Sequence, residues 1–169
     1  SESVLDALAD EFELLREQWI DHNCIMVLKR TGLPEEHPIQ QLTPKDLEDH
    51  KHKLDSSFKL TSAPKGALGF SFAVEGLRFC FVTAHLQATA NNLLEHHTNE
   101  EYCSIRNKQI SEVWEQFRRA QLSNKGSAND CLDGADFTDS HHFTWFFGDL
   151  NYRLTDQSWK CFPSENGLN

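Results

Sequence analysis

Three strongly apolar segments of strand length constrain the fold most. Gly69–Val74 and Leu77–Ala84 are rich in Phe and Val, and the Glu75-Gly76 pair between them predicts a tight β-hairpin. Phe143–Phe147 is a third segment of this kind. Strands this apolar are usually buried on both faces, so they need other layers on either side of their sheet. The sequence therefore predicts an α/β fold rather than a β-sandwich or a helical bundle.

The segments around these strands predict helices and one further strand. Apolar residues at spacings of three and four predict helices over 4–20 and 99–120. Cys24–Leu28 is a short apolar run that predicts a buried strand. The Thr43-Pro44 pair predicts the start of a short polar helix that ends near Leu54. The polar stretch that precedes the last strand, 123–140, predicts a surface loop.

Composition excludes several classes of protein. The 169 residues suffice for one domain with a core, and the formal net charge is −10 without any block of Lys and Arg. A generic nucleic-acid binder carries a basic face, so this charge weakens a nuclease hypothesis without excluding it. No apolar run is long enough for a membrane span, and the first residues do not resemble a secretory signal peptide.

The cysteines point to a reduced protein. None of the five forms a CxxC pair, which disfavours a zinc knuckle, and their odd number and scattered spacing are typical of thiols in a cytosolic protein. Cys80 lies inside an apolar strand and is expected to be a core residue. No CxxxxxR phosphate loop is present, which argues against a cysteine-dependent phosphatase.

The last apolar strand delivers polar residues at its C-terminal end. Asp149 and Asn151 are two positions apart, and on an extended chain such residues point the same way. Asp149 could orient and deprotonate a water, and the Asn151 amide could donate to a phosphoryl oxygen. Gly148 lets the backbone bend closely, and Arg153 could grip a phosphate with two hydrogen bonds. An ordinary turn after a strand explains the same residues.

Three weaker features precede this one. His85 follows a buried strand, where it could donate to a phosphate oxygen, although a surface histidine fits there as well. The Arg106-Asn107 pair lies on the predicted helix and, taken alone, is an ordinary solvated pair. Lys65 precedes Gly66 in a loop of small residues and by itself indicates little.

Together and in this order, the features resemble the inositol polyphosphate 5-phosphatases of the endonuclease/exonuclease/phosphatase superfamily. The run Lys65–Phe72 is most similar to the SH2-containing and synaptojanin-like branch, and Gly148–Arg153 is the most specific motif. The clear resemblance covers 65–159, whereas 1–64 resembles the family weakly. The whole chain, 1–169, is thus expected to be a partial catalytic domain, about half of the family's length.

The resemblance implies a fold and an activity. The fold would be a DNase I-like two-sheet α/β sandwich, incomplete in this chain. The activity would be Mg²⁺-dependent hydrolysis of the 5-phosphate of phosphoinositides or soluble inositol phosphates. Such a protein would be cytoplasmic and peripheral at membranes, with no nucleic acid as partner.

The resemblance also implies a role for each site residue. Asp149 would orient and activate the attacking water, while Asn151 and His85 would bind the scissile phosphate and its transition-state charge. The remaining residues would support the site or bind substrate phosphates, with Lys65 near the entrance: Arg106, Asn107, Arg153 and Lys65.

Parts of the family pattern are not found. The family has a metal-binding Glu upstream and an Asp-His pair near its C-terminus, and the metal ligands of this chain are therefore unknown. Glu11, Glu13 and Glu17 occur in a helical pattern that indicates a solvated face. The metal ligands and catalytic residues of one active site act as a unit, so a chain that lacks some of them could be inactive. The alternatives are a non-catalytic fragment or pseudoenzyme that binds phosphoinositides or proteins, and a nuclease of the same superfamily.

Overall fold

The computed structural model describes residues 4–20, 22–54, 65–87, 100–124 and 137–152. They form a two-stranded sheet of order β1-β2 and a four-stranded sheet of order β3-β4-β5-β6. The elements in chain order are α1 (Val4–Leu8), β1 (Phe12–Ile20), β2 (Asn23–Arg30), the 3₁₀ helices η1 (Pro38–Gln41) and η2 (Pro44–Asp46), β3 (Glu48–Leu54), β4 (Lys65–Val74), β5 (Leu77–His85), α2 (Glu100–Asn124), the 3₁₀ helix η4 (Phe137–Ser140) and β6 (Phe143–Asp149). Among the described helices, none is long and apolar enough to cross a membrane.

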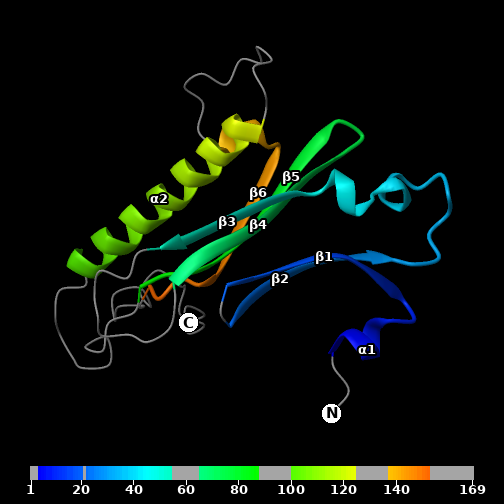
Figure 1. The fold of residues 1–169 in the computed structure, drawn as a ribbon, viewed down its shortest axis with the longest axis horizontal. Helices are drawn as coiled ribbons and strands as arrows, with labels where there is room; N and C mark the ends of the chain where they lie inside the picture. The colour runs from blue at the N-terminus through cyan, green and yellow to red at the C-terminus, as the bar shows by residue number, and fades with distance from the viewer. Residues whose placement is uncertain (1–3, 21, 55–64, 88–99, 125–136, 153–169) are drawn as a thin grey trace, which may run out of the picture.

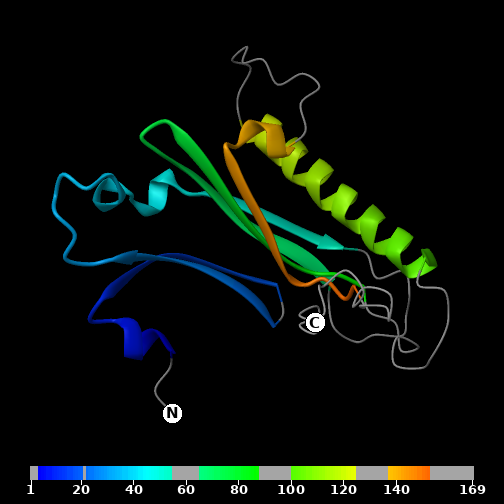
Figure 2. The same cartoon turned by 180° about the vertical axis from the view of Figure 1, so that it is seen from behind.

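The four-stranded sheet is the middle layer. Helix α2 runs along one side of it and the β1–β2 hairpin lies on the other, as both views show (Figures 1 and 2). Each side has its own apolar cluster. The cluster under α2 comprises Leu54, Ala67, Cys80, Val82, Ala84, Leu86, Val113, Phe117 and Phe137. The cluster under β1–β2 comprises Leu15, Ile20, Ile25, Leu42, Leu47, Leu68 and Phe70. The expected α/β class is confirmed.

The central hairpin forms as expected, but its first strand is longer: β4 begins at Lys65, so the expected loop of small residues around Lys65 and Gly66 is wrong. Strands β4 and β5 pair antiparallel up to Val74 and Leu77, so Glu75 and Gly76 are the two turn residues. Both have positive φ, 49° and 80°, which is the backbone of a type I′ turn and matches the twist of the strands. After β5 the chain crosses over through α2 and returns as β6, which pairs parallel with β5.

The expected helix over 4–20 is wrong. Only Val4–Leu8 is helical, and Phe12–Ile20 is strand β1, paired with β2. The register between the two strands shifts between Leu14 and Arg16, which indicates a β-bulge. A bulge breaks the period-two alternation, so the apolar residues of β1 acquire a spacing that is typical of a helix. Glu11, Glu13 and Glu17 therefore do not share a helix face.

The expected polar helix up to Leu54 is also wrong. One 3₁₀ turn forms after Thr43, and Glu48–Leu54 is strand β3. This strand is polar because it is an edge strand, and charged residues on an edge oppose pairing with other chains. Its inward side chains are buried only at His50 and Leu54.

The other expected elements are confirmed where the structure describes them. Cys24–Leu28 lies in β2, the helix over 99–120 is α2, and Phe143–Phe147 lies in β6. The expected burial of the two strands is wrong, because Ile25 is the one buried residue of Cys24–Leu28 and no residue of Phe143–Phe147 is buried. Cys80 is a fully buried free thiol, as expected. Of the expected loop 123–140, residues 125–136 lie outside the described part; 123–124 belong to α2 and 137–140 form η4 instead.

Candidate active site at the end of the four-stranded sheet

Three strands place polar residues at one end of the sheet. Strands β5 and β6 are parallel, so their carboxyl ends share an edge, and His85 is the register partner of Asp149. Strand β4 begins at that same end, with Gly66 opposite His85 and Lys65 just before it. The Leu86 N–H continues the β5–β6 ladder by donating to the Asp149 carbonyl over 3.0 Å. Lys65, His85 and Asp149 are therefore brought together by topology.

These three side chains contact one another. Lys65 Nζ donates a hydrogen bond to His85 Nε2, and that nitrogen lies 3.6 Å from Asp149 Oδ2. Because His85 Nε2 accepts from the ammonium, the ring proton belongs on Nδ1. Lys65 is 3% exposed, whereas the Asp149 side chain is 66% exposed. The site thus combines a buried cation and an imidazole with a carboxylate that is open to solvent.

The charge of Lys65 is set by two opposing effects. Burial lowers the pKa of its ammonium below the ordinary lysine value, because a low-dielectric environment disfavours the charged form. The nearby Asp149 carboxylate acts in the opposite direction and raises this pKa. The Asp149 carboxylate therefore helps to keep the Lys65 side chain protonated although it is buried.

Gly148 allows the two strands to meet at this point. Its φ is 118°, and a Cβ added there would lie 2.3 Å from the Ala84 carbonyl oxygen and 2.9 Å from Thr83 Oγ1. No side chain can occupy that space, and the conformation itself is one that L-residues rarely adopt. The residue before Asp149 therefore has to be glycine for the strand end to take this path.

Asn151 is oriented differently from what strand alternation predicts. Strand β6 ends at Asp149, and Asn151 has a left-handed backbone with φ of 53°. Its N–H donates to Asp149 Oδ1 over 3.2 Å, and its side-chain amide donates to the Leu86 carbonyl over 2.9 Å. The premise that both side chains point the same way is wrong, because the chain is no longer extended. Asn151 joins the ends of β5 and β6, and its role toward phosphate stays a prediction.

Helix α2 contributes a second group beside the first. Arg106 is 1% exposed; its Nε donates to the Gln87 carbonyl over 3.2 Å, and its Cζ lies 5.6 Å from the centre of the Tyr152 ring. The Tyr152 hydroxyl donates to Asn107 Oδ1. Burial is the main cause that raises the pKa of Tyr152 above its usual value, so the hydroxyl stays a donor at neutral pH.

This second group contains residues that the sequence did not single out. Gln87 is held on both sides, since its N–H also donates to Gln109 Oε1 over 2.9 Å. Tyr152 is part of the specific motif but carried no expected role. A glutamine two positions after a strand end has no distinctive pattern, so only the fold reveals Gln87 and Gln109. Arg153, the remaining expected site residue, lies outside the described residues.

The cluster fits a magnesium ion only in part. Mg²⁺ prefers oxygen ligands and is often held by one or two carboxylates, with water and substrate phosphate as the other ligands. Asp149 is the one carboxylate in the described Lys65–His85–Asp149 group, and it is exposed enough to offer an oxygen. Any further protein ligand would have to come from residues outside the Lys65–His85–Asp149 group.

The sequence matches one protein family. The profile of a family described as Endonuclease/Exonuclease/phosphatase family 2 matches residues 10–164, which is most of the chain. No curated protein matches the sequence.

Two solved structures are among those that match the chain. One is the inositol polyphosphate 5-phosphatase domain of a synaptojanin in complex with inositol (1,4)-bisphosphate and a calcium ion; it is 18% identical with a TM-score of 0.46, over 85% of this chain and 32% of that one. The other is truncated Caenorhabditis elegans TDP2, which is 15% identical with a TM-score of 0.37, over 91% of this chain and 45% of that one. The chain therefore spans less than half the length of either structure.

Proposed function

The chain belongs to endonuclease/exonuclease/phosphatase family 2, and from this membership we propose that it carries part of the active site of a metal-dependent phosphoesterase. The substrate in this proposal is an inositol ring phosphate, and the bond that breaks is that of its 5-phosphate. The observation that supports the proposal most directly is the contact among Lys65, His85 and Asp149 at the shared end of three strands.

The three groups match what the reaction demands. Phosphate-monoester hydrolysis is among the slowest uncatalysed reactions, and most of its barrier comes from charge that develops on oxygens. Lys65 supplies a fixed positive charge for a phosphate in a chain whose formal net charge is −10. His85, aligned by its contact with Lys65, binds an oxygen of the phosphoryl group. This contact holds the phosphoryl group beside the Asp149 carboxylate.

Asp149 is the proton acceptor in this mechanism. Its carboxylate is exposed on the site side and anchored by the Asn151 N–H, so it can accept a proton from an attacking water at a fixed place. Mg²⁺, when bound with Asp149 as one ligand, supplies Lewis-acid stabilisation of the phosphoryl oxygens and a lowered pKa of water. Asn151 holds the Asp149 strand end against Leu86, which keeps that geometry constant.

In this proposal, the second group, which includes Arg106 and Asn107 of α2, contacts the part of the substrate away from the scissile phosphate. Arg106 is fixed against Gln87 and Tyr152, and Asn107 lies beside a shallow surface pocket that Lys108 and Ser111 also line. Hydroxyl, amide and ammonium groups in such a pocket suit the other phosphates and hydroxyls of an inositol ring. The order of motifs along the chain, which resembles the 5-phosphatases, supports the inositol substrate over a nucleic acid. A cytoplasmic location at the membrane surface is part of the same proposal.

The test is a hydrolysis assay on the full-length protein with Mg²⁺. Phosphoinositides in vesicles and soluble inositol phosphates would be offered separately, and the position of the released phosphate would be read from the product isomer. We expect loss of the 5-phosphate, and a rate for Asp149→Asn that is lower by about 10²–10⁴-fold, the usual contribution of a general base. Asp10→Asn, which makes the same change at an exposed carboxylate before β1, should keep the wild-type rate.

Three results would count against the proposal. Release from other ring positions alone would reject the 5-phosphate. Nicking of supercoiled plasmid without hydrolysis of inositol phosphates would favour a nuclease. Binding of inositol phosphates with no turnover by the wild-type protein would favour a pseudoenzyme.

A further inference from the structure

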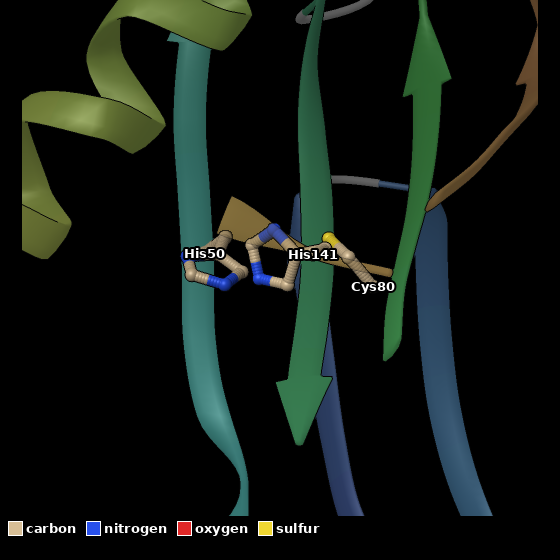
Figure 3. A group of neighbouring side chains, drawn as sticks. All are labelled: His50, Cys80 and His141. Atoms are coloured by element: carbon tan, nitrogen blue, oxygen red, sulfur yellow. The ribbon is translucent and has the colours of Figure 1, made fainter. Parts of the chain in front are cut away.

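Three side chains outside the proposed active site gather beneath α2. His50 comes from β3, Cys80 from β5 and His141 from the turn between η4 and β6 (Figure 3). One ligand atom from each, a ring nitrogen or the sulfur, lies within 4.8 Å of the other two. Figure 3 shows the His141 ring between that of His50 and the Cys80 sulfur. All three residues are buried, at 3%, 0% and 8% exposure.

The sheet leaves room for this cluster. His50 lies opposite Gly69 and Cys80 lies opposite Ser71, so β4 places only a glycine and a hydroxymethyl group between them. An added Cβ at Gly69 would lie 2.9 Å from the Phe81 carbonyl oxygen and 3.1 Å from Val82 Cγ2. The position therefore has to stay a glycine, and nothing bulky separates the two side chains.

The donor set is selective for one kind of metal. Two imidazoles and a thiol suit Zn²⁺ and other borderline-soft transition ions, whereas Mg²⁺ and Ca²⁺ prefer oxygen. Tetrahedral zinc places such ligand atoms about 3.3–3.7 Å apart, so they would need to approach by about 1 Å. A small rotation of the His50 ring, which packs against the Phe117 and Phe137 rings, would have to supply that movement.

The surroundings supply a fourth ligand and a support for the histidines. The Ser71 hydroxyl lies 2.8 Å from His50 Nε2 and donates to Glu48 Oε2 over 3.3 Å, so this carboxylate stands next to the cluster. His141 Nδ1 lies 3.1 Å from the Phe137 carbonyl oxygen, a contact that fixes the ring as backbone carbonyls do in metal sites. One thiolate and one carboxylate would neutralise a divalent ion.

A surface pocket reaches one member of the cluster, His50. His50, Glu48 and Asp49 line a surface pocket together with Gln121 of α2. Burial lowers the pKa of His50 to about 4, which keeps its imidazole in the neutral form that binds metals. Burial also raises the pKa of Cys80 to about 12, so the residue is a thiol until a cation displaces its proton.

We propose that His50, Cys80 and His141 bind one thiophilic divalent transition ion, of which Zn²⁺ is the best match, with Glu48 or a water as the fourth ligand. Binding forms a sulfur–metal bond and releases the Cys80 proton to solvent, with no change of oxidation state. The ion links β3, β5 and the turn before β6 under α2. Its role is structural, and it is separate from Mg²⁺ at Asp149.

Cobalt binding tests the proposal through a signal that only a thiolate gives. Metal-free protein would be titrated with Co²⁺, with Zn²⁺ as competitor. We expect one equivalent to produce the visible bands of tetrahedral cobalt and a sulfur-to-cobalt charge-transfer band, both removed by Zn²⁺ and unaffected by excess Mg²⁺. Cys80→Ala should lose the charge-transfer band, and Cys24→Ala, a free thiol in β2 outside the cluster, should keep it.

Thermal unfolding gives a second readout. Zn²⁺ should raise the Tm of the wild type and of Cys24→Ala, and should leave that of Cys80→Ala unchanged. If Cys80→Ala does not fold, His141→Gln takes its place and should weaken Co²⁺ binding by at least about tenfold. A charge-transfer band that persists in Cys80→Ala, or no cobalt binding at one equivalent, would overturn the proposal.

Discussion

Gly148 lies opposite Ala84 of β5, next to Asp149, where β6 has no room for a side chain. A methyl group there would meet the Ala84 carbonyl oxygen at 2.3 Å, and the φ of 118° is strained for any other residue. We expect Gly148→Ala to lower the free energy of unfolding by about 2–4 kcal/mol, from backbone strain and overpacking together. The shift in the urea midpoint measures this loss.

Gly76 provides the control for that substitution. It also has positive φ, 80°, but nothing lies within 4 Å of its added Cβ. Gly76→Ala therefore isolates the cost of the conformation, about 1–2 kcal/mol. Equal losses for the two variants would mean that the close approach of β6 to Ala84 contributes nothing.

At the residue scale, the sequence could place His85 and Asp149 at strand ends, whereas Lys65 entered the site only through the family resemblance and the supporting residues were not identified. Lys65, His85 and Asp149 all flank apolar strands, and strand ends that share an edge bring such residues together. Asn151 was misplaced because one left-handed residue ends the alternation after β6. Gln87 and Gln109 carry no pattern at all, since their importance depends on a backbone contact between a strand end and a helix.

Among the elements, α2 stabilises the sheet through one row of buried side chains. Phe117 is 1% exposed and packs on Phe137 with ring centres 5.6 Å apart. We expect Phe117→Ala to reduce the free energy of unfolding by about 3–5 kcal/mol, because loss of the phenyl ring leaves a cavity. Leu122→Ala on the same helix, at 41% exposure, should change it by less than about 0.5 kcal/mol. Chemical denaturation of both variants checks this, and a small loss for Phe117→Ala would mean that α2 is not docked as described.

Elements with clean periodicity could be predicted, and those with interrupted patterns could not. The β4–β5 hairpin and α2 follow directly from alternation and from helical spacing. Strand β1 was taken for a helix because its bulge after Leu14 changes the spacing of apolar residues. Strand β3 was missed because an edge strand with alternating charged and histidine side chains has no apolar period.

At the scale of the whole molecule, the DNase I-like α/β class expected from the motifs is confirmed by the family match over residues 10–164 and by the two sheets. The second sheet consists of β1 and β2, which contact β4 and β5. Figures 1 and 2 show this hairpin on the side of the middle sheet opposite α2. The face of β6 on that side remains largely uncovered within the described part of the chain.

The uncovered face is aromatic. Phe143, Trp145 and Phe147 alternate along β6 and are 43–45% exposed, and Trp145 stacks on Phe81 with ring centres 4.5 Å apart. Contiguous apolar surface of this kind is typical of contact sites and promotes association when it is left open. Among the residues that the structure describes, β6 is also an edge strand of its sheet, and edge strands are prone to pair with other chains.

We therefore expect the 169-residue chain to self-associate through the β6 face, with a sedimentation coefficient that rises with concentration. Replacing Phe143 and Trp145 together by Ser should reduce this association, because both side chains are partly solvent-exposed and their loss removes apolar surface. Leu122→Ser, which removes an equally exposed apolar side chain from α2, should leave it unchanged. A longer protein that covers this face should stay monomeric and protect Trp145 from fluorescence quenching by iodide. Sedimentation as a monomer at every concentration, or equal association in all variants, would mean that the aromatic face is not the contact.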